Sequence, residues 1–287
     1  DTLRALFAGR LILIADGDTL RPRWTSIVPD PKRNGLRFAF EATLSRLPGA
    51  LAIEARLFPY DRQHETYLNV HQDGALRLQD LLAGERRTAT FYSGTRQGVA
   101  AVVGTFIRSG IHHIFIGPDH ILFVVGLMLL GGGIGRLIKI VTAFTVAHSV
   151  TLALATLGIL DPPARIIEPL IALSIVYVGV DTLRARRGGR DARALIAIGF
   201  GLIHGFGFAG VLREFGLPQQ ALGWSLFAFN LGVELGQATI VLLVAPVLSL
   251  ARARAPSIHA RIVTVGSWAV SLAGLYWLVE RLFFAGP

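Results

Sequence analysis

Residues 110–130 read GIHHIFIGPDHILFVVGLMLL and carry three histidines and an aspartate directly into an apolar run. The run predicts a membrane-spanning helix, because a helix needs about 20 apolar residues to cross the hydrocarbon core. An ionisable side chain at that depth costs about 3 kcal/mol on insertion scales, so each one needs a partner or a function. The stretch therefore predicts a membrane protein with a polar site near the start of its first span.

The composition of the whole chain agrees with a membrane protein. Of its 287 residues, 52% are hydrophobic and 16% are charged, and the mean hydropathy is +0.54. The net charge of +9 does not predict nucleic-acid binding, because many arginines lie in short segments between apolar runs, where they set topology. The chain has no cysteine, so a metal ion would be held by His, Asp, Glu or water. It begins at Asp1 without a methionine or a signal sequence, as expected for an exported protein that has been processed or trimmed.

Residues 1–97 predict a small all-β, sandwich-like domain. In residues 35–44, Leu36, Phe38, Phe40 and Ala42 alternate with other residues at the period of a half-buried strand. Five further runs have the composition of strands and are separated by turn signals. These runs are residues 10–16, 21–28, 51–60, 64–73 and 86–94.

Residues 98–287 predict an α-helical polytopic membrane domain with about six transmembrane helices. The apolar blocks lie at about residues 111–131, 138–160, 164–183, 193–212, 223–249 and 261–282. Residues 97–110, before the first block, fit either an interfacial helix or an extension of that span.

Positive charges between the spans predict the orientation, since cytoplasmic loops are enriched in arginine and lysine. The loops after the first, third and fifth spans carry or adjoin Arg136, Lys139, Arg184, Arg186, Arg187, Arg190, Arg193, Arg252, Arg254 and Arg261. The other two loops carry only Arg165 and Arg213. The N-terminal domain and the C-terminus are therefore expected outside the cytoplasm, which for the inner membrane of a bacterium is the periplasm.

The ionisable residues of the opening stretch are spaced so that they could form one binding site. His113 and His120 are seven residues apart and so lie on nearly the same helical face, and His112 and Asp119 form a parallel stripe beside them. Pro118 cannot donate a backbone hydrogen bond, so the helix is expected to kink or to begin at Gly117-Pro118. A broken helix directs both of its ends toward one site, as in many transporters.

Other spans carry polar residues that can converge on the same region. Imidazole and carboxylate groups suit a divalent transition metal such as Ni, Zn or Co. The predicted ligands are His113, Asp119, His120, His148, His204, Glu168 and Glu234. The predicted supporting residues are His112, Ser149, Asn230 and Gln237. For Ser149, Asn230 and Gln237, a simple hydrogen bond between helices is the alternative.

Five segments resemble the HupE/UreJ family of bacterial membrane proteins: HIFIGPDHILFVVGLMLL (113–130), FTVAHSVTLALATLG (144–158), EPLIALSIVYVGVDTL (168–183), GLIHGFGFAGVL (201–212) and FNLGVELGQ (229–237). The motif of His113, Asp119 and His120 carries most of the resemblance. It implies a nickel-permease-like protein, since the family is associated with nickel uptake for hydrogenase and urease maturation. With its N-terminal domain, the chain resembles a subgroup of the family that has an added extracytoplasmic domain.

Three functions are compatible with these residues. The first is a nickel/cobalt-type metal permease or metal-delivery protein with a periplasm-facing site inside the membrane. The second is an intramembrane zinc-dependent hydrolase acting on a lipid or a peptide, with Glu168 or Glu234 as general base. The third is a metal-sensing or metal-storing accessory protein. In each case the β domain could receive a periplasmic partner or substrate.

Overall fold

The computed structural model describes residues 7, 9–30, 35–61, 64–84, 86–186, 191–208 and 222–284. The chain forms two compact units, the first built mainly from residues up to Gly104 and the second mainly from residues after it. The predicted boundary at residues 97 and 98 lies close to this division. Arg187, Arg190, Arg213 and the end of the fourth predicted span lie outside the described residues.

The first unit is a set of antiparallel strands. Its elements are β1 (Leu11–Ala15), β2 (Asp18–Thr19), β3 (Arg23–Asp30), β4 (Gly35–Glu41), β5 (Ala50–Ala55), β6 (Glu65–Gln72), β7 (Ala75–Ala83) and β8 (Thr88–Tyr92). One sheet has the order β2-β1-β5-β8, and β3-β4 and β6-β7 form two further antiparallel pairs. A small core of Ala55, Leu82 and Ala89, with Leu68 packed against it, joins the β6-β7 pair to the larger sheet. The predicted small all-β domain is confirmed.

Strand β7 was not among the predicted strands. Its sequence, ALRLQDLLA, consists mainly of residues that favour helices and contains no β-branched residue. It is a strand because it pairs with β6 along its length, from Ala83 opposite Glu65 to Ala75 opposite Gln72. Tertiary pairing here overrides local propensity.

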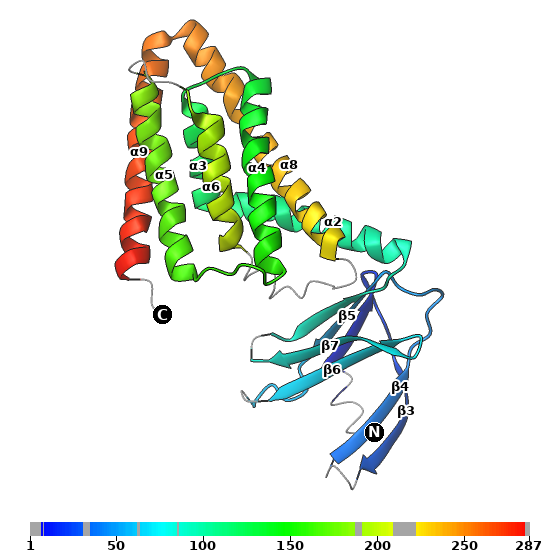
Figure 1. Ribbon diagram of the computed structural model, residues 1–287. Helices are drawn as coiled ribbons and strands as arrows, with labels where there is room; N and C mark the ends of the chain where they lie inside the picture. The colour runs from blue at the N-terminus through cyan, green and yellow to red at the C-terminus, as the bar shows by residue number, and fades with distance from the viewer. Residues whose placement is uncertain are drawn as a thin grey trace. The chain divides into compact units, whose positions relative to one another are not determined.

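The second unit is a bundle of helices (Figure 1). The helices are α2 (Arg96–Ile116), α3 (Pro118–Leu129), α4 (Ile134–Thr156), α5 (Ala164–Arg186), α6 (Arg193–Gly207), α8 (Leu222–Arg254) and α9 (Pro256–Phe283). The first residues of α2 and of α8 are counted with the first unit. Helices α3, α5 and α8 run in one direction, and α4, α6 and α9 run in the opposite direction (Figure 1). The predicted polytopic helical fold is confirmed.

Five helices in the described part of the chain are long and apolar enough to cross a membrane: α2, α4, α5, α8 and α9. Helices α3 and α6, with 12 and 15 residues, are shorter apolar helices. The predicted span 111–131 is therefore not one helix. Its first residues belong to α2, which begins at Arg96, so residues 97–110 extend a helix as one of the two interpretations predicted.

The break between α2 and α3 falls at Gly117-Pro118, as predicted. Pro118 is the first residue of α3, and Gly117 has extended backbone geometry, with φ of −84° and ψ of 99°. The amide of Gly117 still donates to the carbonyl of His113. The last turn of α2 and the first turn of α3 therefore meet at this joint.

Glycines allow close packing of α6 against α4. A Cβ atom at Gly205 would lie 2.1 Å from Thr151 Oγ1 and 2.3 Å from the carbonyl oxygen of His148. A Cβ atom at Gly201 would lie 2.5 Å from the carbonyl oxygen of Phe144. Small residues with this spacing let helix backbones touch in a membrane.

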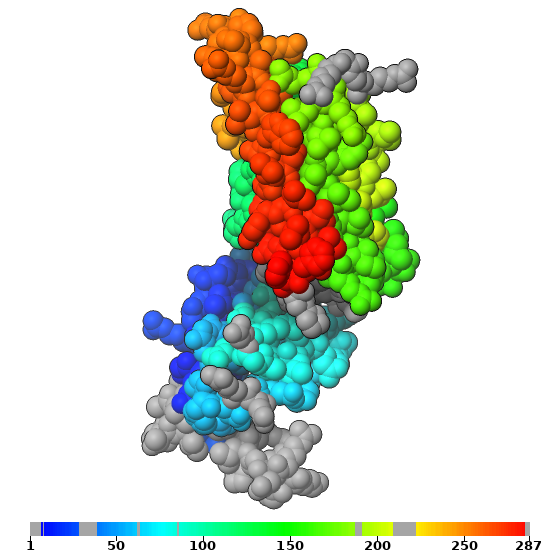
Figure 2. Space-filling model, turned by 90° about the vertical axis from the view of Figure 1, so that its left-hand side faces the viewer, coloured from blue at the N-terminus to red at the C-terminus, as the bar shows by residue number. Residues whose placement is uncertain are grey.

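Helix α9 lies at the surface of the helical unit beside α5 (Figure 2). Its exposed face carries Trp268, Leu272 and Tyr276, which are 55%, 58% and 66% exposed and spaced four residues apart. An apolar stripe with helical spacing suits contact with lipid tails.

Candidate functional site

Four imidazole rings from four helices converge in the helical unit. His113 lies on the last turn of α2, His120 on the first turn of α3, His148 on α4 and His204 on α6. The ring centroid of His120 lies 4.3 Å from that of His113 and 5.4 Å from that of His204, and the centroids of His113 and His148 are 6.4 Å apart. We call these four residues the imidazole cluster.

Phenylalanine rings enclose the imidazole cluster. Phe208 and Phe229 stack on one another and contact His113, with centroids 4.0 Å and 5.5 Å from its ring. Phe123 and Phe144 contact His204 at 5.2 Å and 5.3 Å. His148 and His204 are 1% and 2% exposed. These aromatic walls keep water away and so strengthen electrostatic interactions inside the cluster.

The hydrogen bonds of His148 determine which ring nitrogen carries its proton. Asn230 donates its amide N–H to the carbonyl of Leu226 at 2.8 Å, which turns the amide oxygen toward His148. His148 Nδ1 lies 3.2 Å from that oxygen and therefore donates to it. Nε2 then carries a lone pair and has no hydrogen-bond partner among the described residues.

The same reasoning applies to His204. The hydroxyl of Ser174 on α5 donates to the carbonyl of Ile171 at 2.6 Å, so its oxygen can only accept from His204 Nε2, 2.9 Å away. His204 Nδ1 therefore carries a lone pair, and it too is buried without a partner among the described residues. Metal-binding histidines are commonly oriented in this way, by a hydrogen bond from the ring nitrogen that does not bind metal.

Three further buried side-chain atoms at the site have no hydrogen-bond partner among the described residues: His113 Nε2, His120 Nδ1 and Glu234 Oε2. With His148 Nε2 and His204 Nδ1 they make a set of nitrogen and carboxylate donors, which suits a borderline divalent ion. No three His, Asp or Glu side chains among the described residues are already arranged to hold a metal ion. Binding by three of them would therefore require side chains to rotate.

Asp119 lies beside the imidazole cluster and is engaged through both carboxylate oxygens. Oδ1 accepts the backbone N–H of His120 at 3.0 Å and lies 3.1 Å from His120 Nδ1. Oδ2 pairs with Arg281 Nη2 of α9 at 3.3 Å. The other terminal nitrogen of Arg281 donates to the backbone carbonyl of Glu168 at 3.2 Å.

A polar seam between α4 and α8 adjoins the imidazole cluster. Beyond the His148–Asn230 pair, Thr145 donates to Gln237 Oε1 at 3.0 Å and Thr142 donates to Glu234 Oε1. The seam supplies hydroxyl, amide and carboxylate oxygens in place of apolar contacts.

Three predicted residues lie outside this arrangement. The side chains of His112 and Glu168 are exposed, and neither is among the rings and carboxylates that meet at the cluster. The Ser149 hydroxyl donates to the carbonyl of Thr145 in its own helix at 2.6 Å. Asn230 and Gln237 do pair with residues of α4, as hydrogen bonds between helices.

Several residues of the site were not predicted, among them Ser174, Phe208 and Arg281. A serine and a phenylalanine are common in apolar helices and give no signal by themselves. Arg281 stands within one turn of the end of α9, where an arginine ordinarily marks the membrane boundary.

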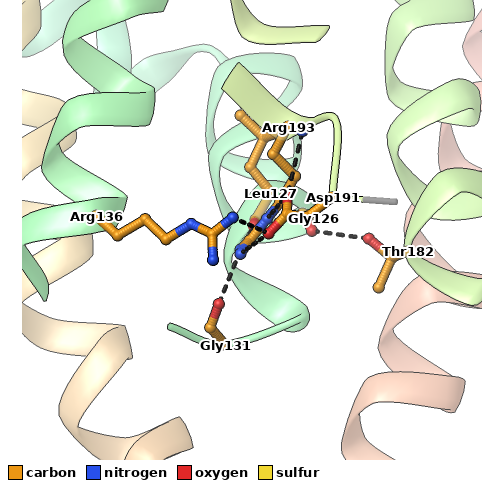
Figure 3. Close-up of polar contacts among 7 residues, drawn as sticks. All are labelled: Gly126, Leu127, Gly131, Arg136, Thr182, Asp191 and Arg193. Atoms are coloured by element: carbon orange, nitrogen blue, oxygen red, sulfur yellow. Dashed lines mark hydrogen bonds and ion pairs between the residues drawn. The ribbon is translucent and has the colours of Figure 1, made fainter. Parts of the chain in front are cut away.

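At the opposite end of α3 and α6, Arg193 holds the two helices together (Figure 3). It is 3% exposed and donates to the carbonyls of Leu127 and Gly131 at 2.8 Å and 2.9 Å, at the C-terminal end of α3. Asp191 accepts two side-chain bonds from Arg193 and pairs with Arg136 of α4 at 2.7 Å. The hydrogen bonds from Arg193 hold the pKa of the Asp191 carboxyl below its usual value. A cation at a helix C-terminus also favours the helix dipole.

Comparison with known proteins agrees with this architecture. No curated protein and no solved structure matches the chain. The family model described as HupE / UreJ protein matches residues 90–281, a range that contains all four histidines of the cluster, Asp119, Glu234 and Arg281. The chain is therefore a membrane protein of the HupE/UreJ family, which indicates a nickel- or cobalt-type transport or metal-delivery role.

Proposed function

We propose that the protein is a permease for a divalent transition metal ion, with Ni²⁺, Co²⁺ and Zn²⁺ as candidate cargo. The observation that carries the proposal is the orientation of His148 and His204. Each ring is held by a hydrogen bond on one nitrogen and presents a buried lone pair on the other. A purely structural histidine in a membrane helix would be expected to satisfy both nitrogens, since an unpaired polar atom costs free energy there.

The polar residues of the site form two groups, one where the metal ion would enter and one along which it would leave. Asp119 and His120 are on the first turn of α3, beside the joint with α2, and a carboxylate at that position attracts a dication. His113, His148 and His204 then offer neutral nitrogen donors. The polar seam, with the unpaired oxygen of Glu234, offers a continuation between α4 and α8.

We further propose the predicted orientation in a bacterial inner membrane, with the entry facing the periplasm. In support, Arg136, Arg193, Arg252 and Arg254 all lie near one set of helix ends in the helical unit, which the positive-inside rule assigns to the cytoplasm. The N-terminal β domain, residues 1–97, and the C-terminus would then be periplasmic. The β domain would be available to a periplasmic partner.

Transport by the purified protein in sealed vesicles tests the proposal. Ni²⁺, Co²⁺ and Zn²⁺ are offered separately on one side, and uptake is measured for wild type, His120→Ala and His204→Ala. Loss of uptake in both variants is expected, whereas His71→Ala, on β6 of the first unit, should transport normally.

A different result of this experiment would favour another function. Tight retention of one metal without flux under any gradient would contradict a permease. It would favour a resident metal, as in a zinc hydrolase or a storage protein. Equal loss of metal binding in His71→Ala and His120→Ala would move the site away from the imidazole cluster.

A further inference from the structure

We propose that Arg281 is a competitor for the metal ion, built into the protein. In the structure its guanidinium neutralises Asp119, and a dication that binds Asp119 must take its place. The inference rests on the proposed function and adds to it a residue that sets how tightly the entry holds its cargo.

The geometry places Arg281 at the entry. Its Nη2 lies 3.3 Å from Asp119 Oδ2, and the two side chains are 22% and 16% exposed. The other carboxylate oxygen of Asp119 already faces His120. A cation arriving at Asp119 therefore finds its carboxylate engaged on both sides, and Arg281, which reaches it from another helix, can leave without breaking the turn at the start of α3.

Electrostatic repulsion prevents Arg281 and a metal dication from binding Asp119 at the same time. Two like charges at a few ångströms repel by several kcal/mol at an effective dielectric constant of about 20, so Arg281 and a dication cannot both pair with Asp119. A half-buried guanidinium in turn requires another acceptor when it leaves. Binding of the ion is thus coupled to movement of Arg281.

Glu168 offers such an acceptor. Its backbone carbonyl already accepts a hydrogen bond from Arg281 Nη1 at 3.2 Å, and its side chain is exposed at the same end of α5. Rotation of the Arg281 side chain toward this carboxylate would release Asp119 while keeping the guanidinium paired. This gives Glu168 a role as a partner of Arg281 in place of the predicted role as a metal ligand.

Equilibrium binding of Ni²⁺ to the full chain in lipid nanodiscs tests the proposal. Arg281→Gln is expected to bind Ni²⁺ about tenfold more tightly than wild type, and Arg281→Lys to stay within about threefold of it, since a charge is retained. Arg165→Gln, which removes an exposed arginine from the start of α5, is the matched control and should leave the affinity unchanged. In an Asp119→Asn background, Arg281→Gln should no longer strengthen binding.

Two results of the Ni²⁺-binding experiment would overturn the proposal. Weaker Ni²⁺ binding by Arg281→Gln would show that Arg281 positions Asp119 as a ligand and does not compete. Unchanged binding would show that Arg281 does not act on the site. Wild-type protein that binds none of the three metals would instead contradict the proposed function. In that case a double-mutant cycle on thermal stability with Arg281→Gln and Asp119→Asn still tests the pair, and a coupling of zero would refute it.

Discussion

The imidazole rings of His113 and His120 lie with their centroids 4.3 Å apart, although the helix that carries them is broken between them. His113 lies in the last turn of α2, and His120 lies in the first turn of α3. Their contact therefore depends on the geometry of the joint at Gly117-Pro118.

Gly117→Ala should disturb the site through this joint. A Cβ atom at Gly117 would lie 2.5 Å from His120 Nδ1 and 3.1 Å from Asp119 Oδ1, so the imidazole must move. We expect metal affinity to fall about tenfold or more, because ligand positions are held to within a fraction of an ångström in working sites. Isothermal titration with Ni²⁺ measures the loss. Gly133→Ala, which introduces a Cβ atom into open space at the start of α4, is the control and should bind normally.

Ser174→Ala should weaken metal binding without removing a ligand. Ser174 fixes the ring of His204 through its Nε2, and removal of such a partner typically costs about 10–100-fold in metal affinity. Ser149→Ala is the matched variant, because among the described residues that hydroxyl bonds only to a carbonyl of its own helix. Equal effects of the two variants would show that the orientation of His204 is unimportant.

Gly205→Ala should destabilise the helical unit. The added methyl group would meet Thr151 Oγ1 and the carbonyl of His148, and overpacking of this kind costs about 1–3 kcal/mol. The thermal unfolding midpoint in detergent measures the effect. Gly199→Ala places its methyl group on the same helix with no atom within 4 Å, so its midpoint should stay unchanged or rise. A normal midpoint for Gly205→Ala would contradict the close contact of α4 and α6.

Asp191→Asn should lower stability and alter its dependence on pH. The pKa of Asp191 is lowered in the folded protein, so its contribution is present above the unfolded value of about 3.9 and is lost as the pH falls from there toward the folded pKa. At pH 7 the substitution should cost about 1–3 kcal/mol, since hydrogen bonds to charged groups contribute this much. Unfolding midpoints of both proteins between pH 7 and pH 3 should converge at the acid end. Asp80→Asn, which breaks the Asp80–Arg86 pair on the β domain, should cost less than about 1 kcal/mol.

The features predictable from sequence are those with a strong local signal. Alternation predicted most of the strands, length and apolarity predicted most of the helices, and Pro118 predicted the joint. The convergence of His113, His120, His148 and His204 remained a hypothesis at that level, and the structure places their rings together.

The rest depends on contacts between distant segments. Strand β7 has a helix-favouring sequence and is specified by pairing with β6. Glu168 was expected beside the histidines because a carboxylate in an apolar block needs a partner, but it is exposed near the start of α5. Arg281 could not be assigned to Asp119 from sequence, because 162 positions separate them and only the packing of α9 places its last turn beside α3.

The close approach of α4 and α6 gives the imidazole cluster two unlike halves. His148 and His204 stand on helices that pack closely at Gly201 and Gly205, where backbone carbonyls of α4 lie against α6. His113 and His120 stand on either side of a joint where Pro118 provides no backbone N–H to tie the two helices together. The first pair is therefore held in place by close helix packing, whereas the second pair can shift with the joint. Any change in the shape of the site as an ion enters or leaves would therefore be borne by the hinge between α2 and α3.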